Sequence, residues 1–139
     1  MKNDNIELVS HAHGTILKAL GFDEPCYSIH DYGYMIPRIT TMAKPRFINS
    51  KMNVGHVSKT CTAPTYSQAF RWLRKKGIIC SVEIDYYYDS KGVFKITENK
   101  YKYAIVSDNK LHDMVDFRTY EDAETQCLSQ AIEILMSKK

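Results

Sequence analysis

The sequence predicts an α+β fold, in which one antiparallel sheet carries helices on a single face in the order α-β-(basic loop)-α-β-β-β-α. Capping patterns mark helices near the middle and the end of the chain, and between them residues 78–88 alternate with a period of two. Strands joined by short turns between helices favour an antiparallel sheet covered on one side. The 139 residues fit a single domain over residues 1–139.

The first helix is predicted over residues 11–20. Ser10 is a typical N-cap and Gly21 a typical C-terminal stop. Gly14 should weaken this helix by about 1 kcal/mol relative to Ala, so the helix depends on tertiary contacts. A strand-like run rich in Tyr and Ile follows at residues 26–35.

The second helix has the clearest signals. Thr65 and Gln68 form a Thr-x-x-Gln capping box directly after Pro64, and Gly77 ends the helix. The apolar stripe predicted to be buried contains Tyr66, Ala69, Phe70, Trp72 and Leu73.

Three strands and a helix are predicted for the second half. One face of the first strand contains Ile78, Cys80, Val82, Ile84, Tyr86 and Tyr88, and we expect this face to be buried. A turn at residues 89–92 leads to a strand from Val93 with Tyr101, Tyr103 and Ile105 on one face. Asp108-Asn109 suggests the next turn, and Leu111, Val115 and Phe117 indicate a poorer third strand. Thr119 with Asp122 caps the final helix.

Charge is distributed unevenly along the chain. Residues 1–77 have 11 basic and 5 acidic side chains, a net of +6, whereas residues 78–139 have 8 and 11, a net of −3. No acidic residue occurs between Asp31 and Glu83. Such a stretch attracts anionic partners. The segment at 36–62 carries much of this charge, and a connection of that length is typically functional or mobile.

These basic side chains form the candidate anion-binding or nucleic-acid-binding site. The nine residues are Arg38, Lys44, Arg46, Lys51, Lys59, Arg71, Arg74, Lys75 and Lys76. Tyr32, Tyr34 or Phe47 would stack on a base while the cations hold phosphate. The alternative interpretation is a solvated helix face beside a charged loop, which is common in soluble proteins.

Catalytic and metal-binding patterns are weak. His11 and His13 do not face each other on a helix, and Cys26 and His30 lie too far apart along a strand to bond. Cys26, His30, His56 and Cys61 match no known zinc spacing. Glu83 and Asp85 fit the solvated face of a strand better than an acid–base pair. We therefore expect no catalytic residue, no metal, no cofactor and no enzymatic activity.

The expected compartment is the cytoplasm. No apolar run approaches the roughly 20 residues that span a bilayer, and no secretory signal follows Met1. The four cysteines are widely spaced, without a Cys-x-x-Cys pair, and are expected to be reduced thiols.

Three stretches resemble small uncharacterised proteins encoded by phages and prophages of the Bacteroides group. They are LGFDEPC at 20–26, APTYSQAFRWLR at 63–74 and TYEDAE at 119–124. The resemblance implies a phage-encoded protein acting in the cytoplasm of a bacterial host, and it implies no activity or catalytic residue. The segment at 36–62 is more basic here than is usual in those proteins.

A helix, three strands and a helix from Thr65 to Met136 also follow the element order of a double-stranded-RNA-binding domain. Those domains hold phosphates with lysines at the start of the second helix. Glu121 and Asp122 occupy that position here and would repel phosphate. This mode of RNA binding is therefore disfavoured.

Three functional hypotheses follow. The first is a small non-enzymatic phage protein that binds a macromolecular partner, most simply a protein. The second is a nucleic-acid-binding protein that uses the basic residues between 38 and 76, and whose affinity would fall steeply with salt. The third is a sponge for a phosphorylated nucleotide signal, which would need a closed pocket and an oligomer.

Overall fold

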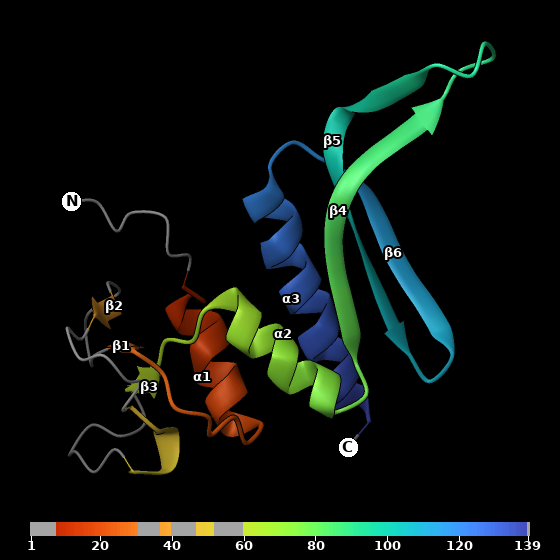
Figure 1. Ribbon diagram of the computed structural model, residues 1–139. Helices are drawn as coiled ribbons and strands as arrows, with labels where there is room; N and C mark the ends of the chain where they lie inside the picture. The colour runs from red at the N-terminus through yellow and green to blue at the C-terminus, as the bar shows by residue number, and fades with distance from the viewer. Residues whose placement is uncertain (1–7, 31–36, 40–46, 52–59, 139) are drawn as a thin grey trace. The chain divides into compact units, whose positions relative to one another are not determined.

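The computed structural model describes residues 8–30, 37–39, 47–51 and 60–138. It has the predicted α+β fold, and the predicted order of helices and strands is confirmed in outline (Figure 1). The described strands form two antiparallel three-stranded sheets, where the sequence analysis expected one. Contacts group the chain into two units, residues 1–72 and 73–139.

The first helix begins at the predicted residue and ends one residue before the predicted limit. α1 spans His11–Ala19, and the Ser10 side chain accepts a hydrogen bond from the backbone N–H of His13 at 3.2 Å. Gly21 follows the helix with φ of 100°, a left-handed conformation that favours glycine. Leu17 and Phe22 are fully buried and anchor the helix end in the core of this unit.

The first sheet is small, and its strand order is β2-β1-β3. β1 (Ser28–His30) pairs antiparallel with β2 (Pro37–Ile39) and with β3 (Cys61–Thr62). The short helix η1 spans Asn49–Lys51. Of the strand predicted at 26–35, the described part is an isolated bridge at Cys26 and then β1, and the remainder lies outside the described residues.

The capping box at the start of α2 (Tyr66–Lys75) forms as predicted. The Thr65 hydroxyl accepts from the Gln68 N–H at 3.1 Å, and the Gln68 side-chain oxygen accepts from the Thr65 N–H at 3.0 Å. Of the predicted stripe, Phe70 is half-buried and the other four side chains are buried. The boundary between the two units falls inside this helix, after Trp72.

The second unit consists of a meander and one long helix. β4 (Ile79–Tyr88), β5 (Phe94–Ser107) and β6 (Lys110–Phe117) form a sheet in that order, and α3 (Tyr120–Ser137) packs on one face of it (Figure 1). Thr119 caps α3 by accepting from the Asp122 N–H at 3.0 Å. None of the described helices combines the length and apolar character needed to cross a bilayer.

Both predicted turns of the meander are present. Asp108 and Asn109 have φ of 52° and 62°, as required at the two central positions of a type I′ hairpin turn. At the other turn, the Asp89 carboxylate accepts from the N–H groups of Lys91 and Val93, both at 2.9 Å. Gly92 has φ of 78°, which glycine adopts without strain.

The predicted burial of one face of β4 is wrong in its outer half. Cys80 and Val82 are partly buried on the α3 side of the sheet, but Ile84, Tyr86 and Tyr88 are each about half exposed or more. The reason is length, because β4 and β5 continue past the N-terminal end of α3, as Figure 1 shows. Alternation predicts which side chains share a face of a strand. It does not predict how much of that face is covered by another packed element.

Candidate functional site

The outer part of the β4–β5 hairpin carries a cluster of exposed aromatic rings. We call residues 84–97 the arm. The ring centroids of Tyr86 and Phe94 lie 5.2 Å apart, those of Tyr88 and Phe94 5.8 Å, and those of Tyr86 and Tyr88 6.0 Å. Their exposed fractions are 49%, 64% and 50% for Tyr86, Tyr88 and Phe94. The rings therefore pack on one another and leave half of their surface open.

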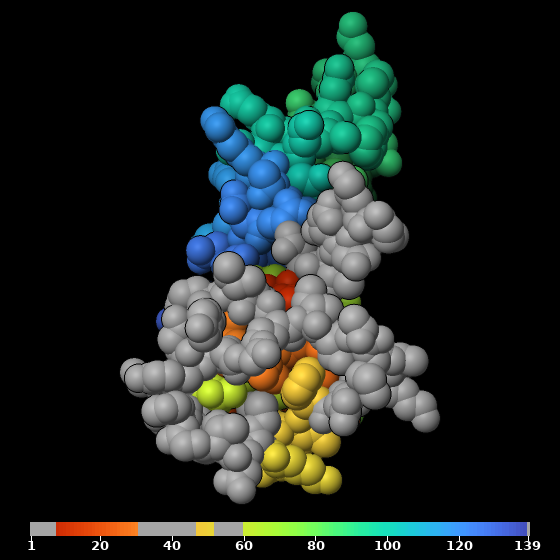
Figure 2. Space-filling model, turned by 90° about the vertical axis from the view of Figure 1, so that its left-hand side faces the viewer, coloured from red at the N-terminus to blue at the C-terminus, as the bar shows by residue number. Residues whose placement is uncertain are grey.

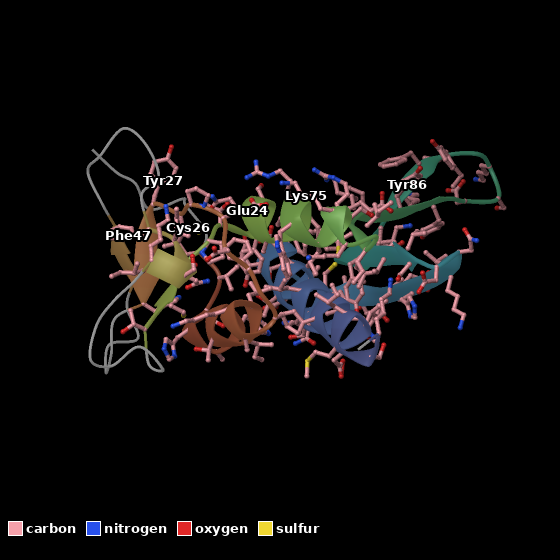
Figure 3. The ribbon with its side chains drawn as sticks, turned by 90° about the horizontal axis from the view of Figure 1, so that it is seen from below. Glu24, Cys26, Tyr27, Phe47, Lys75 and Tyr86 are labelled. Atoms are coloured by element: carbon pink, nitrogen blue, oxygen red, sulfur yellow. The ribbon has the colours of Figure 1, made fainter. Side chains whose placement is uncertain are left out.

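The strand register places these rings on one face. Tyr88 pairs with Phe94 and Tyr86 with Ile96 across the hairpin. Side chains of directly paired residues share a face of the sheet. Ile84 and Ile96, both 48% exposed, extend the apolar surface around the rings. Tyr86 is labelled on this part of the hairpin in Figure 3.

An irregularity separates the arm from the sheet beneath it. Ile84 pairs with Tyr101, whereas Tyr86 pairs with Ile96, so β5 contains extra residues at this point. The Thr97 hydroxyl lies 2.9 Å from the Asn99 carbonyl oxygen and 3.2 Å from that of Asp85. Bulges bend and twist a strand, and here β5 changes direction (Figure 1). The arm is consequently a two-stranded ribbon (Figure 1), and in Figure 2 the green and teal atoms of this part of the chain extend beyond the blue atoms of β6 and α3.

The arm has no net charge. It contains Asp85, Asp89, Lys91 and Lys95. Asp85 lies 4.0 Å from the ammonium group of Lys102, and the Asp89 carboxylate is bound within the turn. An uncharged aromatic surface lacks the excess of cations on which phosphate binding depends. The surface is better suited to an apolar partner.

The nine predicted cations cannot be assembled into one surface from the described residues. Lys44, Arg46 and Lys59 lie outside them, and of Arg38 only the backbone in β2 is described. Lys51 and Arg71 belong to the first unit and are exposed; Arg74, Lys75 and Lys76 belong to the second and are exposed. A shared anion-binding surface therefore stays a prediction.

Arg71 has an acidic neighbour that sequence reasoning did not anticipate. Its guanidinium lies 3.2 Å from the Glu24 carboxylate, although 47 positions separate the two residues. This contact reduces the positive potential of that part of α2. Surface ion pairs of this kind contribute about 0–1 kcal/mol to stability.

The predicted stacking residues are only partly described. Tyr32 and Tyr34 lie outside the described residues. Phe47 is half-buried, and its backbone forms a bridge with Cys26 through hydrogen bonds of 2.8 and 3.0 Å (Figure 3). This pairing gives Phe47 a place in the structure of the first unit. Its use as a stacking residue stays a prediction.

A histidine and cysteine cluster lies inside the first unit. The rings of His11 and His30 meet edge to face at 5.4 Å, and buried His30 donates from Nε2 to the Val9 carbonyl oxygen at 2.8 Å. Cys61 Sγ lies 3.8 Å from the Thr15 hydroxyl. The sequence analysis considered His11 with His13, so the actual partner of His11 was missed.

The electrostatics of this cluster do not activate a nucleophile. Burial raises the pKa of Cys61 and raises that of Cys26 to about 11, so both thiols are protonated near neutral pH. Burial also lowers the pKa of His30. Within the described residues, no group of three or more His, Cys, Asp or Glu side chains is placed to hold a metal ion.

Two surface depressions differ in their lining. In the first, polar side chains form hydrogen bonds within the protein, and the second is lined by both polar and apolar side chains. The first, of about 350 Å³, contains Asp23, which accepts from Ser50, and Asn49, which donates to the Phe22 carbonyl. The second, of about 400 Å³, lies between β6 and α3 beside Met114 and Thr125. Neither depression gathers cations for a phosphorylated ligand.

Comparisons of the chain with protein-family models, with curated proteins and with solved structures find no match. The arm is the feature that sequence reasoning missed. The sequence contains a signal for it, because the apolar alternation of β4 continues through Tyr86-Tyr87-Tyr88 to the following turn. The strand is therefore longer than the segment that the single helix α3 covers.

Proposed function

We propose that this chain is a non-enzymatic binding protein, and that the aromatic face of the arm contacts a protein partner. The observation that carries the proposal is the cluster of Tyr86, Tyr88 and Phe94, whose rings touch one another while about half of each stays exposed. Tyr and Phe are enriched at the centres of protein interfaces, where charged side chains are depleted.

The size of the surface fits an interface anchor. A buried aromatic side chain removes roughly 150–250 Å² from water, so half-exposed rings leave about 100 Å² each and about 300 Å² in total. A standard interface buries about 800 Å² per partner. The arm would supply the central contact, and neighbouring surface would supply the rest. On the resemblance described above, we extend the proposal to a phage or prophage protein whose partner belongs to the bacterial host or to the phage.

A capture experiment with matched variants tests this proposal. The tagged chain is incubated with a Bacteroides lysate, and bound proteins are quantified for the wild type, for Tyr88→Ser with Phe94→Ser, and for Leu111→Ser. Leu111 is 63% exposed on the same sheet and matches Tyr88 at 64%, but it lies outside the arm. Loss of a stoichiometric partner with the arm variant alone is expected. Equal recovery with all three proteins, or no partner with the wild type, would contradict the proposal.

A further inference from the structure

The two edges of the second sheet differ in how they are protected. Sheet edges expose unpaired N–H and C=O groups, and proteins block them with charges, bulges or short strands. The β6 edge has a register shift and Asp116 at φ of 75°, together with Lys110 and Asp113. Among the described residues, β4 pairs with β5 alone, and residues 84–88 contain one charge and no Pro or Gly. Within the arm, which β6 does not pair with, the second edge is residues 94–97 of β5, and it ends at the irregularity beside Thr97. The outer β4 edge runs through residues 84–88 without such a break.

We infer that a second copy of this chain pairs antiparallel with residues 84–88 of β4, with Tyr86 at the centre of the symmetric register. In this register Tyr86 lies opposite Tyr86 of the second copy, and Ile84 lies opposite its Tyr88. A two-fold axis makes such a contact self-complementary. The inference rests on the proposed function in that both treat the arm as an interaction element.

Charge selects this register over its neighbours. A register centred on Ile84 would place Glu83 opposite Asp85 of the second copy. A register centred on Asp85 would place that residue opposite Asp85 of the second copy. Like charges directly opposite each other are destabilising in a sheet. Centring on Tyr86 places Asp85 opposite Tyr87 of the second copy, whose phenol can donate a hydrogen bond to the carboxylate. The like-charged pair in this register is Glu83 with Asp89, which lies beyond the end of β4 and whose carboxylate already accepts two hydrogen bonds within its turn. Registers centred on Tyr87 or Tyr88 pair fewer strand residues, because β4 ends at Tyr88.

Edge pairing and face binding use different surfaces of the arm. Pairing along β4 would join two aromatic faces side by side, so that six rings line one side of a four-stranded ribbon. The face would remain open for the partner proposed above. Because the arm is neutral, two copies can approach without net repulsion between their arms. The paired segment is short, so the dimer should be weak and should depend on protein concentration.

Opposite charges at Tyr87 test the register. Tyr87 is 52% exposed and, by strand alternation, lies on the face opposite Tyr86 and Tyr88, so its replacement leaves the ring cluster intact. In Tyr87→Glu the new carboxylate lies opposite Asp85 of the second copy, and this repulsive pair occurs twice per dimer. The dimer Kd should therefore rise by about tenfold. Tyr87→Lys makes two attractive pairs and should leave the Kd unchanged or lower. Sedimentation equilibrium over a wide range of protein concentration measures both.

Cross-linking gives the second measurement. In the proposed register the Cβ atoms at position 86 of the two copies lie about 5 Å apart, whereas those at position 88 lie about 14 Å apart. Mild oxidation should therefore link Tyr86→Cys into dimers far more than Tyr88→Cys, with the wild type as the cysteine background. A monomeric wild type at all concentrations, equal Kd values for the Glu and Lys variants, or equal linking at both positions would overturn the inference.

Failure of this inference and failure of the proposed function have different signatures. A wild type that stays monomeric yet loses its captured partner in the Tyr88→Ser, Phe94→Ser variant refutes the dimer and supports the function. A wild type that dimerises as described yet captures nothing supports the dimer and contradicts the function. Melting temperatures of Tyr87→Glu and Tyr87→Lys, compared with the wild type, separate loss of pairing from loss of folding.

Discussion

Replacement of Gly14 by alanine should destabilise the first unit, although it improves helix propensity. Gly14 is buried in α1. A Cβ atom built there would lie 3.0 Å from Cys61 Sγ, 3.1 Å from the Thr62 carbonyl oxygen and 3.5 Å from the His30 ring. Two of these distances are shorter than ordinary van der Waals contacts, and one of them is to backbone. β3 must move away if the methyl group is to fit.

The two opposing effects can be compared. Alanine in a helix interior gains about 1 kcal/mol over glycine. Overpacking of a close contact costs about 1–3 kcal/mol. The net expectation is a loss of about 1 kcal/mol, with a range from near zero to about 2. The steric cost exceeds the propensity gain because the Thr62 oxygen belongs to a paired strand and cannot rotate aside.

Urea unfolding followed by fluorescence measures this balance. The only tryptophan of the chain, Trp72, is buried and contacts Phe22 edge to face at 5.5 Å, so it reports on the first unit. Ala12→Gly is the matched control, because Ala12 is exposed in the same helix and its replacement isolates propensity. Both variants should lose stability. If Gly14→Ala instead gains as much as Ala12→Gly loses, the reasoning from close contacts is refuted.

Two further predictions concern a helix cap and two histidines, of which His30 is buried and His13 half-buried. Thr119→Ala should lower the free energy of unfolding by about 1 kcal/mol, because it removes the hydroxyl that caps α3. Thr119→Ser should retain most of this stability. Equal losses for the two variants in chemical denaturation would contradict the prediction. Burial lowers the pKa of His13 and His30 below 6.5. As the pH falls, these histidines therefore bind protons more readily in the unfolded chain than in the folded chain. Stability should therefore fall as pH drops from 7 to below 6.5, and His13→Gln should reduce that slope; an unchanged slope would count against the assignment.

The helix starts and the tight turns could be predicted because their chemistry is local. Ser10, Thr65 and Thr119 each bond a backbone N–H three positions further on, so the whole interaction is visible in a short stretch of sequence. The same holds for the Asp108-Asn109 turn, where two residue types that tolerate positive φ are adjacent. Such signals do not depend on what the rest of the chain does.

The pairing of distant groups could not be predicted in the same way. His11 meets His30, and Arg71 meets Glu24, across 19 and 47 positions that no local pattern connects. The division into two sheets has a similar origin. β1 and β3 are two or three residues long, and a strand that short has too few positions to show alternation.

On the exposed face of the arm, the sequence alternation and the actual burial of side chains differ. A period of two identifies Cys80, Val82 and the positions that follow as one face. Burial of that face depends on α3, whose 18 residues run beside the inner part of β4 and β5 only. The sequence therefore predicted the strand and its faces, while the uncovered surface emerged only from the lengths of two packed elements.

The internal contacts of the arm bear directly on its use in binding. A two-stranded ribbon without a helix is only marginally stable in water, and here three rings in mutual contact and the Asp89 turn hold it in shape. Ordering a side chain at an interface costs about 0.5–1.5 kcal/mol, so three rings that are already packed avoid roughly 1.5–4.5 kcal/mol of that cost. Contacts that hold the ribbon together also prepare its open face for a partner.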